Sequence, residues 1–272
     1  MISALRQSAL SVHFAPPRLS MRWFALWRRN FLVWKKLMIP SMLGNLADPL
    51  IYMLGLGYGL GALLPEVSGT RYISFLAAGT ICFSTMNAAS FEALYSAFSR
   101  MHVQKTWEAV LNAPMALDDV VLGELVWAAC KSMLSGLAIL VVIFILGLAT
   151  AAGPAQLLAV LLVVLLTGLC FAALGLIVTA LAPSYDFFMY YFTLFITPMG
   201  LLSGVFFPLD QLPQAFQYLS SILPLTHAVA LVRPLLAGEW PAGAGGHIAY
   251  LLAIAVVAFW IAVGLARRRL LR

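Results

Sequence analysis

The stretch QLLAVLLVVLLTGLCFAALGLIVTAL, residues 156–181, contains no Asp, Glu, Lys or Arg and is long enough to cross the hydrocarbon core of a bilayer as one helix. Five further runs are mainly apolar and of similar length, at about 42–64, 72–98, 120–148, 187–207 and 248–266. Hydrophobic residues make up 63% of the 272 residues and charged residues 10%, whereas soluble domains carry roughly 25% charge. A soluble globule could not hide this much apolar surface, so the sequence predicts an all-α polytopic membrane protein with six transmembrane helices.

Two segments precede the first span. Residues 1–20 have no continuous apolar stretch, and we expect a disordered cytoplasmic leader there. Residues 21–38, MRWFALWRRNFLVWKKLM, have the periodicity of an amphipathic helix. One stripe carries the rings of Trp23, Trp27, Phe31 and Trp34, and the opposite arc carries Arg22, Arg28, Arg29, Lys35 and Lys36. Such a helix is suited to the headgroup plane, with its rings in the acyl boundary and its cations toward anionic lipid or a partner.

Two further segments differ from ordinary spans and loops. Residues 100–112, RMHVQKTWEAVLN, are polar enough for a cytoplasmic loop and are expected to be helical before Pro114. Residues 208–240 contain four prolines and two short amphipathic pieces, 212–222 and 225–236, neither of which is long enough to span. We therefore expect a re-entrant or interfacial helix pair before the last span.

The basic residues are distributed unequally between the two sides of the transmembrane domain, residues 42–266. Of the 16 Lys and Arg residues, 14 lie in the leader, the amphipathic helix, the loop at 100–112, the start of the third span or a basic tail at 267–272. Only Arg71 and Arg233 lie on the other side. Because cytoplasmic loops carry an excess of Lys and Arg, both termini are expected to be cytoplasmic and the re-entrant pair to face outward. This distribution argues against a nucleic-acid-binding domain, despite the net charge of +6.

No catalytic or metal-binding constellation emerges from the sequence. The four histidines are scattered over different loops on both sides of the membrane, which argues against a shared metal site. No lysine follows a G-x-x-x-x-G run, so the chain lacks a phosphate-binding loop of that type. We expect no cofactor and no enzyme activity in this chain, and if ATP drives it, another chain must bind the nucleotide.

Several polar residues lie inside the predicted spans, where they are costly. The cytoplasmic halves of the second and fifth spans carry Asn87, Ser90, Glu92, Tyr190, Tyr191 and Thr193. These residues can line a path for a hydroxyl-rich substrate or hydrogen-bond one helix to another. Glu124 and Lys131 lie two turns apart on one face of the third span, too far for direct contact, and no chain of buried carboxylates supports a proton relay through them.

The arrangement of these parts resembles the permeases of type-2 ABC exporters, and several local strings are similar to the NodJ family, the permease of the nodulation-factor exporter. The strings are WRRNFLVWKK from Trp27, LADPLIY from Leu46, FEALYSAFSRM from Phe91, QKTWEAVL from Gln104, LAPSYDFF from Leu181, FPLDQLP from Phe207, LPLTHAVALVRP from Leu223 and RRRLLR from Arg267. They cover the chain in order from about Trp23 to Arg272, which makes chance similarity implausible.

The resemblance implies a type-2 ABC exporter fold in the bacterial inner membrane. It also implies a homodimer of permeases bound to two NodI-like ATPase subunits, which hold ATP and Mg²⁺. Residues 100–112 would be the coupling helix that docks on the ATPase, through Arg100, Lys105, Trp107 and Glu108. The amphipathic helix would be the interface helix beside it, with Trp23, Trp27, Arg28, Arg29, Trp34, Lys35 and Lys36.

The substrate implied by the resemblance is a lipochitooligosaccharide, a short N-acetylglucosamine chain that carries a fatty acyl group. Such an amphiphile suits a path at the dimer interface, where the tail stays in lipid and the sugars meet polar or aromatic side chains. The predicted wall of this path comprises Asn87, Ser90, Phe188, Tyr190, Tyr191 and Phe195. The re-entrant segment would close the outer end as a gate, led by Phe206, Phe207 and Leu209.

Other cargoes and other classes of protein stay open at this point. Exporters of this type also move other glycolipids, polysaccharides and hydrophobic drugs. A membrane enzyme acting on lipid-linked sugars would need paired carboxylates or a His cluster near one interface. Asp118 and Asp119 are adjacent, but successive helical positions point about 100° apart, and two neighbouring loop acids are usually just solvated. An ion-coupled carrier would normally show internal repeats, and the two halves of the chain show no convincing similarity.

Overall fold

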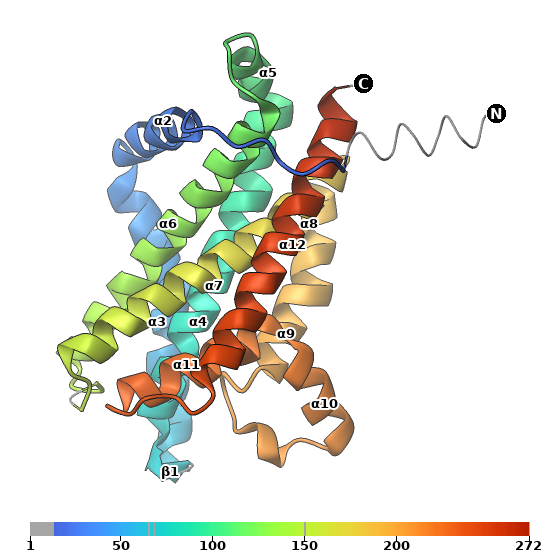
Figure 1. Cartoon of the computed structure of the whole chain (residues 1–272). Coiled ribbons are helices and arrows are strands. Elements are labelled where there is room, and N and C mark those ends of the chain that lie inside the picture. Colours follow the sequence, from blue (N-terminus) through green and yellow to red (C-terminus); the bar gives the residue numbers. More distant parts are fainter. Residues whose placement is uncertain (1–13, 65, 68, 150, 272) are drawn as a thin grey trace.

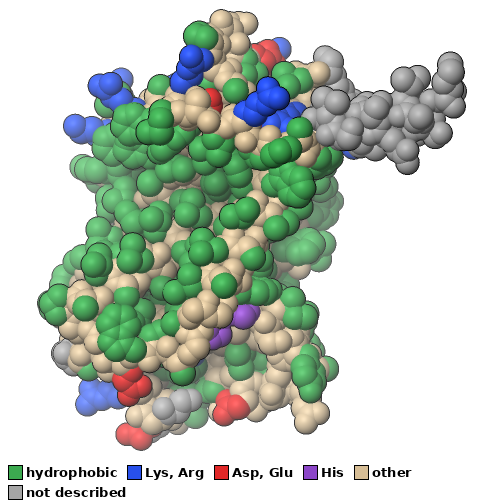
Figure 2. All heavy atoms as spheres, viewed as in Figure 1, with side chains coloured by type: hydrophobic (Ala, Val, Ile, Leu, Met, Phe, Trp, Pro, Cys, Tyr) green, Lys and Arg blue, Asp and Glu red, His purple; other side chains and the backbone are tan. Residues whose placement is uncertain are grey.

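The computed structural model describes residues 14–64, 66, 67, 69–149 and 151–271, and within them the chain is almost entirely helical. The longer helices run between two ends of the molecule (Figure 1). One end carries α2 (Trp23–Lys35), α5 (Thr106–Leu111) and the last turns of α12 (Ala244–Leu270). Lys and Arg gather at this end in the space-filling view (Figure 2), and we call it the basic end. The opposite end carries a two-stranded hairpin, β1 (Glu66–Val67) and β2 (Thr70–Arg71), and α10 (Gln214–Ile222).

Four helices are long and apolar enough to cross a membrane: the helix over Tyr72–Val103, α6 (Leu117–Ile145), α7 (Pro154–Leu181) and α12. Two helix pairs qualify as candidate spans only when each pair is taken together across a sharp bend. These pairs are α2 with α3 (Met38–Gly59) and η1 (Leu60–Ala62), bent by 85°, and α10 with α11 (Pro224–Leu236), bent by 87°. The described residues therefore hold four candidate spans, or up to six if each bent pair is one span, and the arrangement of six spans plus a re-entrant pair stays a prediction.

The predicted fifth span, 187–207, is shorter than expected and divided. Its helical part consists of α8 (Asp186–Tyr191), the π-helical η4 (Phe192–Ile196) and α9 (Thr197–Leu202). The helix ends at Leu202 because Gly204 has a φ of +71°, in the left-handed region that interrupts a right-handed helix. A short 3₁₀ turn, η5 (Leu209–Gln211), then leads into α10.

The bend between α2 and α3 differs in position from the predicted helix end at Pro40. α2 ends at Lys35 and α3 begins at Met38, so Pro40 lies in the first turn of α3. A proline there removes no helical hydrogen bond, because the first N–H groups of a helix have no intrahelical partner.

The aromatic stripe of α2 packs in part on the protein, and its position at the acyl boundary stays a prediction. The rings of Phe31 and Trp34 contact the ring of Trp127 on α6. Nearby, a Cβ added to Gly123 of α6 would lie only 2.9 Å from the side chain of Leu26. The close approach at Gly123 lets α2 lie against α6.

The second span continues further than predicted and then breaks. α4 (Tyr72–Phe91) is followed by two π-helical segments, η2 (Glu92–Ser96) and η3 (Ser99–Val103). Lys105 then adopts a positive φ of 51°, and α5 begins at Thr106. The predicted helix at 100–112 is therefore divided, because its first residues extend the second span and only Thr106–Leu111 forms the separate helix.

Small residues allow the core helices to approach closely. A Cβ on Gly79 of α4 would lie 2.6 Å from the carbonyl oxygen of Val205, and one on Gly175 of α7 would lie 2.8 Å from the Cβ of Ala93. Gly55 and Gly59, in the glycine-rich half of the first span, have no neighbouring atom within 4 Å of such a Cβ. Close helix packing thus occurs at α4 and α7, and also at Gly57 of α3, where a Cβ would lie 2.8 Å from the side chain of Ile73, whereas Gly55 and Gly59 face open space within the protomer.

The ends of the chain are tied together at the basic end. Asp118 accepts from the backbone N–H of Arg18 at 2.7 Å and pairs with Arg267 at 2.5 Å. Asp119 accepts from the backbone N–H and the hydroxyl of Ser20. The expectation of a disordered leader therefore fails for residues 14–20, while residues 1–13 lie outside the described part of the chain. The predicted basic tail is also helical up to Leu270, as the last turns of α12.

Candidate functional site

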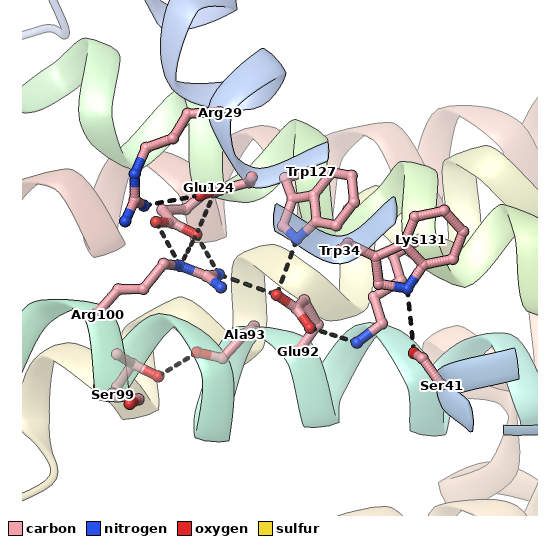
Figure 3. A network of polar contacts seen from close by, with 12 residues as sticks. Arg29, Trp34, Ser41, Glu92, Ala93, Ser99, Arg100, Glu124, Trp127 and Lys131 are labelled. Carbon is pink, nitrogen blue, oxygen red and sulfur yellow. Dashed lines mark hydrogen bonds and ion pairs between the residues drawn. The ribbon is translucent and has the colours of Figure 1, made fainter. Parts of the chain in front are cut away.

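Two carboxylates and two cations meet near the basic end (Figure 3). Arg100 bridges the carboxylates, since its Nη2 lies 2.9 Å from Glu92 Oε1 and 2.5 Å from Glu124 Oε2. Lys131 Nζ lies 2.6 Å from Glu92 Oε2. The side chains of Glu92 and Glu124 are only 3% and 0% exposed, so both carboxylates are removed from water and neutralised within the protein. We call these four residues the ion network.

The π-helical segments bring Glu92 and Arg100 to one side of their helix. Eight residues of a regular α-helix rotate by roughly 80° beyond two full turns, so two side chains at this spacing would diverge. η2 and η3 contain wider turns, which lower the rotation per residue and close this angle. Both side chains can therefore face Glu124 on α6.

Three neutral donors connect the ion network to other elements. Trp107 of α5 donates through Nε1 to Glu124 Oε1 at 3.1 Å, and Asn30 of α2 donates to Glu124 Oε2 at 3.3 Å. Trp127 of α6 donates through Nε1 to Glu92 Oε1 at 2.8 Å. Four elements, α2, the end of the second span, α5 and α6, thus meet on two carboxylates.

The ion network fixes the relative position of these elements more than it stabilises the fold. Burying charges costs free energy that their mutual attraction only partly repays, whereas removing one partner leaves an uncompensated charge at a cost of about 3–5 kcal/mol. The ion network therefore holds α2, the end of the second span, α5 and α6 in one relative position. A displacement of α5 must move Glu124 and Arg100, or break their contacts.

Two cavities flank Lys131. The first, of about 450 Å³, lies beside the ion network and is lined by Arg29, Trp34, Tyr95, Arg100 and Lys131 among others, and we call it the interfacial cavity. The second, of about 640 Å³, lies between α3, α4 and the helical part of the predicted fifth span (α8, η4 and α9), which we call the fifth helical segment. Its lining includes Tyr52, Phe83, Asn87, Phe192 and Thr197. We call the second one the lateral cavity. Both cavities are also lined by Ser41 and Lys131.

The four residues predicted to contact an ATPase lie in two different environments. Lys105 and Glu108 are exposed on and beside α5. Arg100 faces inward, because Glu92 and Glu124 bind its guanidinium, and the ring of Trp107 is buried on the same carboxylates. Only the first two are therefore free to meet a partner directly in this conformation, while Arg100 and Trp107 connect α5 to the spans.

The residues of the predicted interface helix divide in the same way. Arg28, Lys35 and Lys36 are exposed, whereas Trp34 is buried. Trp23, Trp27 and Arg29 are half-buried. Trp34 donates through Nε1 to the Ser41 hydroxyl at 3.1 Å and so links α2 to the start of α3.

The predicted substrate wall is only partly assembled. Asn87 lines the lateral cavity, and Tyr190 and Phe195 are exposed on the fifth helical segment. Tyr191 is half-buried and stacks on the ring of Phe195. Ser90 and Phe188 have buried side chains, and the ring of Phe188 packs in an aromatic cluster with Tyr95, Phe98 and Tyr185. These two residues support the fold and do not face a cavity in this conformation.

The predicted gate residues lie at the opposite end. Phe206, Phe207 and Leu209 are half-buried, and the backbone carbonyl of Phe206 accepts from the hydroxyl of Tyr72 at 3.1 Å. The ring of Phe206 contacts the rings of Tyr52 and Phe83, with centroid distances of 6.2 and 5.7 Å. Both partners line the lateral cavity, so the ring of Phe206 lies behind its wall, and the role of a gate stays a prediction.

Several contacts were missed by the sequence analysis. An ion pair joins Glu92 and Lys131, which lie on two different helices. In the sequence, the only sign of this pair is that charged residues occur within apolar runs. His227 and His247, predicted to be scattered, lie with their Nδ1 atoms 2.7 Å apart. Within the described residues, however, no group of three or more His, Cys, Asp or Glu residues comes together as a metal site.

Asp118 and Asp119, which a membrane enzyme could have used as paired acids, are engaged elsewhere. Arg267 and the backbone N–H of Arg18 bind Asp118, and Ser20 binds Asp119. Asp118 therefore holds residue 18 of the leader and α12 together, and Asp119 holds residue 20 of the leader against α6.

The long apolar helices define a multi-pass membrane protein. Residues 21–237 match the family model described as ABC-2 type transporter, and the chain belongs to that family and, within it, to the Nodulation protein J proteins. It is 50% identical to Nodulation protein J of Rhizobium meliloti (strain 1021) over 257 residues, which cover 94% of this chain and 97% of that one. It is 35% identical to Nodulation protein J of Azorhizobium caulinodans over 211 residues, 78% of this chain and 82% of that one. The inner membrane transport permease YadH of Escherichia coli is 23% identical over 217 residues, again 78% of this chain and 82% of the relative.

Proposed function

We propose that this permease exports an amphiphilic acylated oligosaccharide of the lipochitooligosaccharide, or nodulation-factor, type across the bacterial inner membrane, driven by ATP hydrolysis on a separate subunit. Family membership and the name of the relatives support the cargo class. The observation that carries the driven mechanism is the ion network, because it joins α5 and α2 to the spans that border the lateral cavity.

The ATPase would dock at the basic end. α5 projects there from the body of the molecule (Figure 1), and it presents the exposed, oppositely charged side chains of Lys105 and Glu108. A displacement of α5 would pull on Glu124 through Trp107 and then on Arg100. In this way a NodI-like ATPase, holding ATP and Mg²⁺, would move the end of the second span.

The cargo would pass beside the lateral cavity in a homodimer of permeases. The cavity combines aromatic rings, which match the C–H face of a sugar, with the polar side chains of Asn87 and Thr197. Tyr190 and Phe195 are exposed within the protomer, so a second copy could bring them to the same path. Phe206 would act as the outer gate, and the acyl tail would remain in lipid.

The orientation follows from the positive-inside rule, with the basic end and both termini in the cytoplasm. The same geometry suits other glycolipids, polysaccharides or hydrophobic drugs, so the cargo must be measured directly.

The decisive experiment measures ATP-dependent uptake of radiolabelled acylated chitooligosaccharide into inverted inner-membrane vesicles that contain the permease and its ATPase. We expect Glu108→Lys to abolish co-purification of the ATPase and uptake. The control Glu66→Lys reverses an equally exposed charge at the opposite end and should change neither. Uptake of a different glycolipid in place of the acylated chitooligosaccharide would reject the cargo, and normal ATPase binding by the Glu108→Lys variant would reject the docking site.

A further inference from the structure

We propose that the interfacial cavity binds the headgroup of an anionic phospholipid. The cavity lies beneath α2 at the basic end and has a volume of about 450 Å³, within the usual range of roughly 300–1,000 Å³ for ligand sites. The proposal concerns a bound lipid and does not depend on the identity of the exported molecule.

In and around the cavity, cationic side chains outnumber carboxylates by one. Arg100 and Lys131 are neutralised by Glu92 and Glu124 in the ion network. Arg29 is different, because among the described residues it makes no ion pair, and its Nη1 donates only to the side-chain oxygen of Asn30 at 3.1 Å. Figure 3 shows Arg29 and Lys131 at opposite ends of the network. Since Arg29 also lines the cavity, a single negative charge there would complete the balance.

The other lining groups suit a phosphodiester. The cavity wall carries the hydroxyl groups of Ser41, Ser96, Ser99 and Tyr185, which can donate to phosphate oxygens or accept from headgroup hydroxyls. A guanidinium is the side chain best matched to phosphate geometry, because it can donate two parallel hydrogen bonds. Basic pockets between transmembrane helices bind anionic headgroups by this chemistry.

The rim of the cavity argues for a lipid rather than a free anion. Val33 and Leu37 line the cavity and are 54% and 62% exposed. A headgroup in the cavity would therefore place its acyl chains along an apolar face, whereas free phosphate would leave this surface unused.

The test measures binding of dioleoylphosphatidylglycerol to the purified full chain in lipid-free detergent by native mass spectrometry. Dioleoylphosphatidylcholine is the lipid comparison, and inorganic phosphate at equal concentration is the anion comparison. We expect the anionic lipid to bind more tightly than the zwitterionic one, and phosphate not to compete for the site. Arg29→Gln should weaken phosphatidylglycerol binding roughly ten-fold or more, because one charged hydrogen-bond donor is lost.

Two further variants separate the cavity from general surface charge. Arg268→Gln removes the same charge from an exposed position in the last turn of α12, at the same end of the molecule, and should leave binding unchanged. Gln104→Glu adds a negative charge to the cavity lining from an exposed position, and should weaken binding as Arg29→Gln does, even if the latter folds poorly. Equal binding of the two lipids, unchanged binding in Gln104→Glu, or full competition by phosphate would overturn the proposal.

Discussion

At the scale of single residues, Glu92 holds the centre of the buried charge arrangement. It accepts from Arg100, Lys131 and the indole of Trp127, whereas Glu124 binds only one of the two cations of the ion network. Both carboxylates of the ion network are buried, so the balance of charge matters more than any one contact.

The first prediction concerns that balance. Glu92→Gln leaves two buried cations with one carboxylate and should lower the free energy of unfolding by about 3–5 kcal/mol. Adding Lys131→Met restores neutrality, with Arg100 paired to Glu124, and should recover part of this loss. Thermal unfolding of the purified single and double variants in detergent measures the coupling. If the effects of the two substitutions on the free energy of unfolding simply add, Glu92 and Lys131 do not act as a pair.

The second prediction isolates the link from α5. Trp107→Phe keeps the aromatic ring but removes the N–H that donates to Glu124, at an expected cost of about 1–3 kcal/mol. If α5 transmits motion through this contact, ATP hydrolysis should continue in the purified complex while cargo uptake falls. Trp240→Phe, an exposed tryptophan at the opposite end, serves as the control and should preserve both activities. Parallel loss of hydrolysis and uptake would instead indicate that the ATPase no longer docks.

At the scale of whole elements, glycine positions decide which helices approach each other. Gly79 of α4 lies against the backbone of Val205, which cannot rotate away as a side chain can. Gly55 lies in a glycine-rich helix but has open space around it in the protomer. Both glycines lie in apolar helices, and they differ only in the atoms that surround them.

The third prediction compares alanine at these two glycines. Gly79→Ala should destabilise the protomer by about 1–3 kcal/mol, since the added methyl group overlaps a main-chain carbonyl. Gly55→Ala should leave the stability of the protomer unchanged or slightly raised, because alanine is the better helix former. Chemical or thermal unfolding of both variants in the same detergent gives the comparison. Equal destabilisation would mean that the open face at Gly55 is covered within the protomer.

At the scale of the whole molecule, the two ends differ in charge and in the elements they carry. The basic end presents α2, α5 and the end of α12, and the opposite end presents the hairpin and α10 (Figures 1 and 2). The proposed export requires the basic end to face the cytoplasm, because the ATPase would bind there.

The fourth prediction tests this orientation by cysteine labelling. Cys82 and Cys170 are buried and Cys130 is half-buried, so a background with Cys130→Ala should give little labelling. Tyr218→Cys, at a 73% exposed position on α10, should react with a membrane-impermeant maleimide added outside spheroplasts. Val103→Cys, at a 60% exposed position near the basic end, should react only after the membrane is permeabilised. The reverse pattern would place the ATPase-docking surface on the wrong side.

The sequence by itself determined the class of protein and the positions of most elements. Long apolar runs need lipid as their solvent, so α6, α7 and α12 lie close to the predicted spans, and the strings shared with relatives identified the family. The bend near Pro40 and the short pair α10 and α11 were also visible, since proline and segment length are local properties.

Only the tertiary structure decided which polar side chains meet. Arg100 and Trp107 were predicted to face an ATPase, but Glu92 and Glu124 on two other helical segments draw them inward. The π-helical segments, the burial of Phe188 and the tie between Asp118 and Arg267 depend in the same way on neighbours distant in the chain. The periodicity of one helix shows which side is apolar, but a buried charge or ring is placed by the helix opposite it, and a single sequence does not contain that pairing.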